Sequence, residues 1–239
     1  MKITMLSMWY GDASKHLADR ALHLLGKEGI TRWVWAVRPA RDCTQDMLDV
    51  VADFAGKGDE VSIYLEPEDQ PAERIERLSK AGDVLLSTVE DEDYVLWHES
   101  DLFTLPGVAG ALAASGAAAC GGWPVLSHSP THPTLGVRTP RRVTLNNSIF
   151  YDTWGYRSGG VRFSNNPPYH DCYQPTPFAL DSVGSVVLVK ASYIRHGARM
   201  NGRGIVGLCD AIREMGGDVM CDPAVPVVQP VELWTLNDD

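Results

Sequence analysis

Hydrophobic positions recur along the first hundred residues with two periods, one of two residues and one of about 3.6 residues. Apolar and β-favouring residues in the pattern of strands occupy residues 3–10, 31–37, 60–66 and 93–101. Apolar residues at helical spacing occupy residues 13–29, 45–58 and 68–89. Because strands and helices alternate, the chain predicts an α/β fold with a mostly parallel central sheet flanked by helices.

The pattern changes after Asp101. Residues 105–116 predict a short alanine-rich helix, residues 120–134 are rich in turn residues, and residues 140–178 show no clear period. A buried strand, a polar turn, a helix and a final short strand are then predicted at residues 182–192, 200–203, 204–216 and 218–228. No repeat or linker is evident, which predicts one domain over residues 1–239.

The composition is that of an ordinary globular protein, with 44% hydrophobic and 22% charged residues. No apolar run reaches the roughly 18 to 20 residues of a membrane span, and the start of the chain lacks the pattern of a secretory signal peptide. The five cysteines are scattered and form no C-x-x-C pair, so we expect plain thiols. We expect a cytoplasmic protein with no membrane partner.

Charge is distributed unevenly along the chain. The formal net charge is −10, from 21 Lys and Arg residues against 31 Asp and Glu residues. Residues 102–203, however, carry nine basic residues against three acidic ones. The overall negative charge argues against indiscriminate nucleic-acid binding. The net positive charge of residues 102–203 would still allow that part of the chain to bind an anion.

Two carboxylates follow the fourth predicted strand. Glu99 and Asp101 are two residues apart, which places both on one face at the carboxyl end of the strand, where open α/β sheets bind ligands. His98, adjacent to Glu99, is expected on the opposite face. Hard oxygen ligands suit Mg²⁺ or Mn²⁺ with phosphate oxygens at the open positions. The pair predicts either a metal-bound diphosphate or a solvated acidic loop in which Asp101 caps the next helix.

Residues 99–101 form an acidic D-x-D-like triplet between an aliphatic and aromatic strand and a short proline-containing helix. This arrangement resembles the sugar-nucleotide site of GT-A fold glycosyltransferases. Residues 38–44 (RPARDCT) are similar to the loop that contacts the nucleoside in that fold, and residues 74–101 resemble the helix-to-strand unit that leads into its metal motif. Three later segments resemble the fungal mannan-polymerase mannosyltransferases: residues 150–160, 179–200 and 207–216.

The resemblance implies a single GT-A-like, Rossmann-related domain that uses a nucleotide diphosphate sugar as donor and a divalent metal, Mn²⁺ or Mg²⁺. It implies a nucleotide-sugar half over residues 1–101 and an acceptor-binding half over residues 102–239. Glu99 and Asp101 stand at the metal motif, and Asp181 at the position that the family places near the reacting sugar. The implied donor-binding set is completed by Asp12, Asp42, Arg74 and Ser100.

Three departures from the family pattern concern the metal and catalysis. Glu99 replaces an aspartate, which lengthens one ligand arm and keeps the charge. Gly204 and Val206 stand where the family has acids, so a carboxylate for the acceptor or for acid/base chemistry is missing there. Gln229 stands near a late histidine of the pattern, which leaves the third protein ligand of the metal open.

Sugar transfer from a nucleoside diphosphate builds negative charge on the leaving group, which a divalent ion stabilises. An inverting reaction also requires a base for the proton of the acceptor hydroxyl. Asp181 is the first candidate base and Asp210 the second. Alternatively, Asp181 accepts hydrogen bonds from backbone amides in a turn, or faces the sugar in a retaining mechanism.

Arginine and aromatic residues gather in the least regular stretch of the chain. Arginine binds phosphate through a planar fork and aromatic rings stack on sugars and bases, which favours contact with a sugar acceptor, an anionic polymer or a nucleotide. The alternative is a solvated surface over ordinary buried aromatic residues. The candidate acceptor-binding residues are Trp123, Trp154, Tyr156, Arg157 and His170.

With these features, the resemblance implies a metal-dependent glycosyltransferase that moves a hexosyl or pentosyl group to a hydroxyl of a glycan, or of a hydroxylated base in DNA. It implies a cytoplasmic setting in a bacterium or in the host cell of a phage. DNA modification would require binding that falls steeply with salt. One alternative is a non-catalytic sugar-nucleotide or glycan-binding member of the fold. Another is a nucleotidyltransferase, which also uses paired carboxylates and Mg²⁺.

Overall fold

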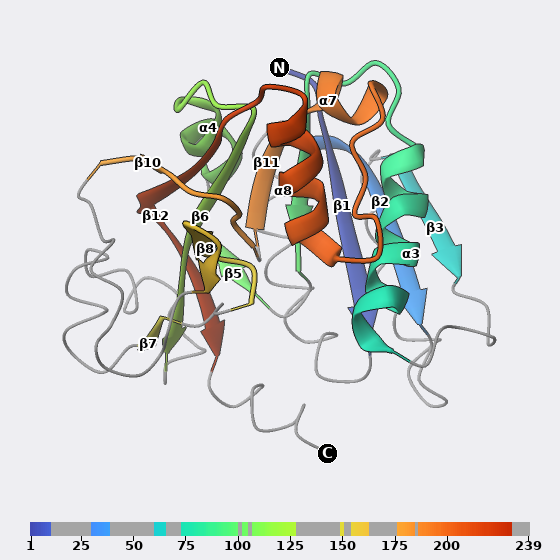
Figure 1. Cartoon of the computed structure of the whole chain (residues 1–239). Helices are drawn as coiled ribbons and strands as arrows, with labels where there is room; N and C mark the ends of the chain where they lie inside the picture. Colours follow the sequence, from blue (N-terminus) through green and yellow to red (C-terminus); the bar gives the residue numbers. More distant parts are fainter. Residues whose placement is uncertain are drawn as a thin grey trace.

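A computed structural model of the chain has a large mixed sheet with helices on both of its faces, and a separate two-stranded sheet (Figure 1). The structure describes residues 1–10, 30–38, 60–65, 73–99, 102–104, 107–127, 149–150, 154–162, 176–184 and 186–230. The helices that the sequence predicts over residues 13–29 and 45–58 lie outside these residues.

The first four strands form a parallel half-sheet. β1 (Ile3–Tyr10) lies between β2 (Ile30–Arg38) and β4 (Tyr94–His98), and β3 (Glu60–Leu65) pairs with the far side of β2. All three pairings are parallel, so the carboxyl ends of these strands meet at one edge of the sheet. The four predicted strands are confirmed.

The second half of the chain adds strands of both directions. β11 (Val186–Lys190) pairs antiparallel with β4 and with β6 (Ala119–Ser127), and β12 (Val219–Pro230) runs parallel to β6. The order is β10-β12-β6-β11-β4-β1-β2-β3, with β5 beside β12 and β7 beside β6. The short antiparallel strands are β5 (Phe103–Thr104), β7 (Ile149–Phe150) and β10 (Phe178–Ala179). The predicted mostly parallel α/β sheet is confirmed, and antiparallel β11 joins its two parallel parts.

Strand β6 lies in a segment that the sequence predicts as turns. A Cβ atom on Gly121 would lie 2.7 Å from Val183 Cβ, and a Cβ atom on Gly122 would lie 2.7 Å from the Val225 carbonyl oxygen. These glycines therefore permit close packing inside the sheet rather than a turn. The turn prediction is wrong for residues 120–127, because pairing with β11 and β12 overrides local propensity.

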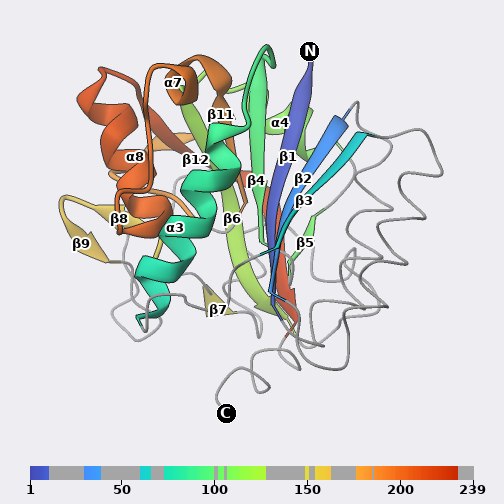
Figure 2. The same ribbon diagram turned by 90° about the vertical axis from the view of Figure 1, so that its right-hand side faces the viewer.

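Helices cover both faces of the sheet (Figures 1 and 2). α3 (Arg74–Ser87) and α8 (Gly204–Glu214) lie side by side on one face, and α4 (Val108–Ala113) covers the other. Side chains along β4 alternate between the two faces in agreement with this. Trp97 packs in the core beneath α3 and α8, whereas Leu96 packs in the core with α4. No helix in the described part of the chain has the length and apolar character needed to cross a membrane.

The segment after α7 (Ala191–Arg195) holds α8 against α3. Met200 donates its backbone N–H to Asp83 Oδ1 (2.6 Å). Gly204 donates its backbone N–H to Ser79 Oγ (2.7 Å). Two polar side chains of α3 therefore satisfy the backbone of the turn that leads into α8.

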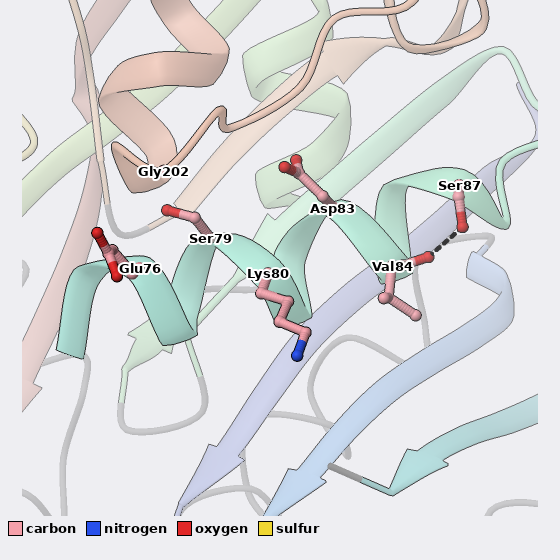
Figure 3. Close-up of a pocket in the computed structure, with 7 residues that line it drawn as sticks. All are labelled: Glu76, Ser79, Lys80, Asp83, Val84, Ser87 and Gly202. Carbon is pink, nitrogen blue, oxygen red and sulfur yellow. Dashed lines mark hydrogen bonds between the residues drawn. The ribbon is translucent and has the colours of Figure 1, made fainter. Parts of the chain in front are cut away.

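An open groove follows this side of α3 (Figure 3). Ser79 and Asp83 point toward the turn at Gly202, whereas Lys80 points away from it. The groove is lined by Glu76, Ser79, Lys80, Asp83, Val84, Ser87 and Gly202. Because Ser79 and Asp83 already accept hydrogen bonds from the turn, this side of α3 serves helix packing.

A buried carboxylate stands just before β4. Glu92 is 2% exposed and accepts hydrogen bonds from Thr4 Oγ1 (2.6 Å) and Arg32 Nη1 (2.9 Å). Its other oxygen accepts the backbone N–H of Glu90 (2.7 Å). Burial alone would raise the pKa of Glu92, but these hydrogen bonds outweigh it and lower the pKa from 4.5 to about 2. Glu92 thus ties β1 and β2 to the start of β4.

Replacing Glu92 with glutamine is expected to lower the free energy of unfolding by about 1 to 3 kcal/mol at neutral pH, because the charge facing Arg32 and Thr4 is lost. The folded-state pKa of about 2 lies below the ordinary 4.5, so the stabilisation is complete above pH 4.5 and is lost as the pH falls from 4.5 toward 2. Urea unfolding of both proteins should therefore show a smaller difference at about pH 3 than at about pH 7.

Asp91→Asn is the matched control for this experiment, because Asp91 is an exposed carboxylate one residue away. It should change the free energy of unfolding little at neutral pH. A difference between Glu92→Gln and the unmodified protein that persists in full at about pH 3 would contradict the role given to Glu92.

Candidate functional site

The carboxyl ends of β1, β2 and β4 form the edge at which the sequence predicts a ligand. Glu99 follows β4 directly and is half-buried. Side chains two residues apart on a strand point to the same face of the sheet. Glu99 is two residues after Trp97, so it lies on the face of the sheet that α3 and α8 cover. A carboxylate at this edge can bind a divalent ion or a polar group of a nucleotide.

His98 occupies the last position of β4 and is 1% exposed. Its Nδ1–H donates to the Glu99 carbonyl oxygen (2.8 Å), which leaves Nε2 to accept from Thr104 Oγ1 (3.4 Å). Burial lowers the pKa of His98 to about 4, so its ring is uncharged at neutral pH. His98 therefore orients the backbone beside Glu99 while its own nitrogens are engaged.

Of the other predicted donor-binding residues, the structure describes only Arg74. Arg74 begins α3 and is exposed. Within the described ranges, no three or more His, Cys, Asp or Glu side chains converge on a possible metal position. The predicted residues that lie outside those ranges are Asp12, Asp42, Ser100, Asp101 and His170.

The two candidate bases, Asp181 and Asp210, lie on either side of Arg213. Arg213 Nη2 is 3.2 Å from Asp181 Oδ1, and Arg213 Nη1 is 3.8 Å from Asp210 Oδ1. Asp181 Oδ2 accepts the backbone N–H of Gly160 (2.6 Å). Asp210 Oδ2 is 2.5 Å from Arg203 Nη1. Both oxygens of each carboxylate therefore have a partner, and the acceptor sites that remain on them could take a proton from an acceptor.

Arg213 is a residue that sequence reasoning missed. It is three residues after Asp210 on α8, which is the spacing at which helical side chains form ion pairs, and this spacing was the available signal. Its second partner, Asp181, is distant in the sequence. The hydrogen bond from Gly160 to Asp181 is the kind that the alternative interpretation of Asp181 predicts.

A tight hairpin follows Trp154. β8 (Arg157–Ser158) and β9 (Val161–Arg162) are joined by Gly159 and Gly160, with φ angles of 58° and 77°. Two successive positive φ angles are typical of the two-residue turns that match the twist of paired strands. The two glycines are therefore explained by the turn itself.

Trp154 lies under both arginines of the hairpin. The Cζ atoms of Arg157 and Arg162 are 5.0 Å and 4.2 Å from the centroid of its ring. Both distances are within the range of cation–π attraction. Two of the candidate acceptor-binding residues, Trp154 and Arg157, thus lie against each other, with Arg162 as a third member.

Trp123 and Tyr156, which the sequence analysis assigns to the acceptor, are core residues. They are 4% and 0% exposed. Trp123 packs edge-to-face on Phe178, with ring centroids 6.3 Å apart. The Tyr156 hydroxyl donates to the Gly122 carbonyl oxygen and also lies 3.3 Å from that of Gly184. The acceptor-binding prediction is wrong for both residues, because their surfaces are already used in packing.

No protein-family model and no curated protein match the chain, but solved structures match its fold. GalNAc-T7, crystallised with UDP, GalNAc and Mn²⁺, has a TM-score of 0.64 and 10% identity over 96% of this chain and 43% of its own. TarS from S. aureus has a TM-score of 0.54 and 12% identity over 96% of this chain and 60% of its own. The fold is GT-A-like.

The third similar structure is a putative glucose-1-phosphate thymidylyltransferase from Bacillus anthracis, in complex with a sucrose. Its TM-score is 0.52, with 10% identity over 92% of this chain and 86% of its own. The chain spans 43% and 60% of GalNAc-T7 and TarS. Identities of this size concern the fold alone, and the resemblance to the fungal mannan-polymerase family stays a prediction.

Replacing Tyr156 with phenylalanine keeps the ring in the core and removes the hydroxyl that bonds the Gly122 carbonyl group. We expect urea unfolding to show a loss of about 1 to 2 kcal/mol, since a buried acceptor loses its donor. Tyr193→Phe is the control, because Tyr193 is a partly exposed tyrosine of α7. An unchanged free energy of unfolding in Tyr156→Phe would contradict the core role.

Proposed function

We propose that the protein is a metal-dependent glycosyltransferase that transfers a sugar from a nucleotide diphosphate donor to a hydroxyl group. The main support is the position of Glu99, a carboxylate directly after β4 at the carboxyl edge of parallel strands, in a fold shared with two solved glycosyltransferases. The presence of UDP, GalNAc and Mn²⁺ in GalNAc-T7 supports a nucleotide-sugar donor and a divalent ion.

In this proposal Glu99 and Asp101 hold the ion, Mn²⁺ or Mg²⁺. Carboxylate oxygens suit both ions, and the neighbouring His98 is engaged through both ring nitrogens, so an oxygen-ligated ion fits the groups present. When bound, the ion stabilises charge on the diphosphate leaving group. The remaining donor contacts are proposed for Asp12, Asp42, Arg74 and Ser100.

The proposed acceptor side lies in the second half of the chain, around Arg213. Asp181 is the proposed base, with Asp210 second, and the charge of Arg213 holds the two carboxylates near each other. Release of Asp181 from Arg213 would free one oxygen for the acceptor proton, while Gly160 keeps the other oxygen in place. The acceptor hydroxyl is proposed to belong to a glycan or to a hydroxylated base in DNA.

A nucleotidyltransferase is the second candidate function. It is favoured by the thymidylyltransferase structure, of which this chain spans 86%. That reaction joins a nucleoside triphosphate to a sugar phosphate and releases pyrophosphate, whereas sugar transfer releases a nucleoside diphosphate. A non-catalytic donor-binding protein would bind the nucleotide sugar and release neither product; Gly204 and Val206 at acid positions of the resembled family support it.

Thermal unfolding with UDP-, GDP- and dTDP-sugars, each with and without Mn²⁺, tests the donor site. We expect one nucleotide family to raise the Tm by about 5 to 10 °C when the donor is about 100-fold above its Kd and Mn²⁺ is present. The rise should disappear in Glu99→Ala and in Asp101→Ala, because each removes an oxygen ligand. Glu76→Ala removes an exposed carboxylate of α3 and should keep the rise.

An unchanged Tm with every donor would contradict the glycosyltransferase proposal. Stabilisation by a nucleoside triphosphate, together with pyrophosphate release, would favour the nucleotidyltransferase instead.

Hydrolysis of the identified donor by water tests the base without knowledge of the acceptor. Asp181→Asn keeps an oxygen that accepts the Gly160 N–H but removes the basic carboxylate, so kcat should fall about 10² to 10⁴-fold while the donor-induced Tm rise stays. Asp210→Asn is the matched comparison. A larger loss in Asp210→Asn would reassign the base, and losses below about threefold in both variants would contradict both assignments.

A further inference from the structure

The β8–β9 hairpin places two like charges opposite each other. Arg157 and Arg162 form a directly opposed cross-strand pair. Like charges in this position destabilise a hairpin. Trp154 offsets part of the repulsion, because both guanidinium groups lie over its ring. The ring is uncharged, however, so the positive charge of the pair is not neutralised by it.

The surroundings of the pair are also positive. Burial lowers the pKa of Arg157, the charges of Arg162 and Arg203 lower it further, and Asp210 opposes them. Asp210 is itself ion-paired with Arg203. In the described part of the chain, neither arginine of the hairpin has a carboxylate at salt-bridge distance, and Arg157 Nε is buried without a hydrogen-bond partner. An anion at this surface would offset the positive charge that no carboxylate of the described residues neutralises.

The hairpin is exposed and stands at one side of the molecule (Figure 2). Val161 is 56% exposed, and Arg162 is exposed beside it. Tyr156 lies directly before β8 and anchors the hairpin in the core beneath α3 and α8. This core is on the same face of the large sheet as Glu99. The hairpin is therefore a protruding cationic ridge on the face of the candidate donor site.

We propose that Arg157, Arg162 and Arg203 bind the phosphodiester backbone of a nucleic-acid acceptor. Each guanidinium fork can bind two oxygens of one phosphate group. A protruding ridge fits a polymer with repeated phosphate groups, whereas a single small anion is held by several donors in a concave site. This inference rests on the proposed sugar transfer, since the surface would hold the molecule that receives the sugar.

Charge elsewhere on the protein restricts where such a polymer can bind. The net charge of −10 opposes the approach of a polyanion to most of the surface. Among the described residues, the cationic ridge is therefore a place where local attraction can overcome the general repulsion, and screening by salt should weaken binding there.

Fluorescence anisotropy of a short fluorescein-labelled DNA duplex, titrated with the full chain at about 50 to 200 mM NaCl, tests this surface. The affinity should fall steeply with salt. Arg162→Ala should weaken binding about 3- to 10-fold and reduce the slope of log affinity against log salt by about one. Arg162→Lys keeps the charge but not the fork, so it should keep the slope and bind more weakly than the unmodified protein.

Lys80→Ala is the charge-matched control, because Lys80 is an exposed cation of α3 that points away from the turn at Gly202. It should leave both the affinity and the salt slope unchanged. The Tm of Arg162→Ala should stay within about 2 °C of the unmodified protein, since the substitution is on an exposed hairpin.

Absence of DNA binding at about 50 mM salt, or equal losses in Arg162→Ala and Lys80→Ala, would overturn the inference. Binding of a glycerol-phosphate polymer without binding of DNA would also overturn it, because the acceptor would then be another class of polymer. The donor-induced rise in Tm, measured on the same samples, separates the two proposals. A donor-induced rise in Tm without DNA binding overturns the nucleic-acid-binding surface alone. DNA binding without a rise in Tm for any donor overturns the proposed sugar transfer.

Discussion

The pairing of β4 with β1 on one side and β11 on the other is the constraint on which the rest of the structure depends. β4 has only five residues, yet it is the strand through which the parallel first half and the mixed second half become one sheet. Its carboxyl end delivers Glu99 to the sheet edge, and the residues just before it place Glu92 among β1 and β2. A change in its register by one residue would exchange the faces of Glu99 and His98.

Environment decides what each carboxylate of this acidic chain can do. Glu92 is buried and fully engaged by hydrogen bonds, so its charge stabilises the fold. Glu99 is half-buried where parallel strands end, which is a position for a ligand. Asp181 and Asp210 share Arg213, which keeps two candidate bases close together at the cost of occupying both. Residue type alone does not distinguish these roles.

Strands β1 to β4, β11 and β12 and the helices α3 and α8 could be predicted because burial repeats at a fixed local period. The position of Glu99 was predictable for the same reason, since it follows from alternation along one strand. β6 was not predictable, because Gly121 serves close packing with Val183, which lies far away in the sequence. The burial of Tyr156 and the pairing of Arg213 with Asp181 likewise depend on contacts between distant segments.

The cationic hairpin and the candidate base are linked by hydrogen bonds, one of which joins the Asp181 backbone N–H to the Arg157 carbonyl oxygen (2.9 Å). Gly160, in the turn between β8 and β9, donates its backbone N–H to Asp181, whose other oxygen is held by Arg213. A phosphate that neutralised the opposed arginines would remove their repulsion and so stabilise the hairpin in which Gly160 lies. Because the geometry of that turn sets the direction of the N–H, anion binding at the ridge would also fix the position of Asp181. If both proposals hold, acceptor binding and placement of the base would therefore be coupled through the same six-residue hairpin, residues 157–162.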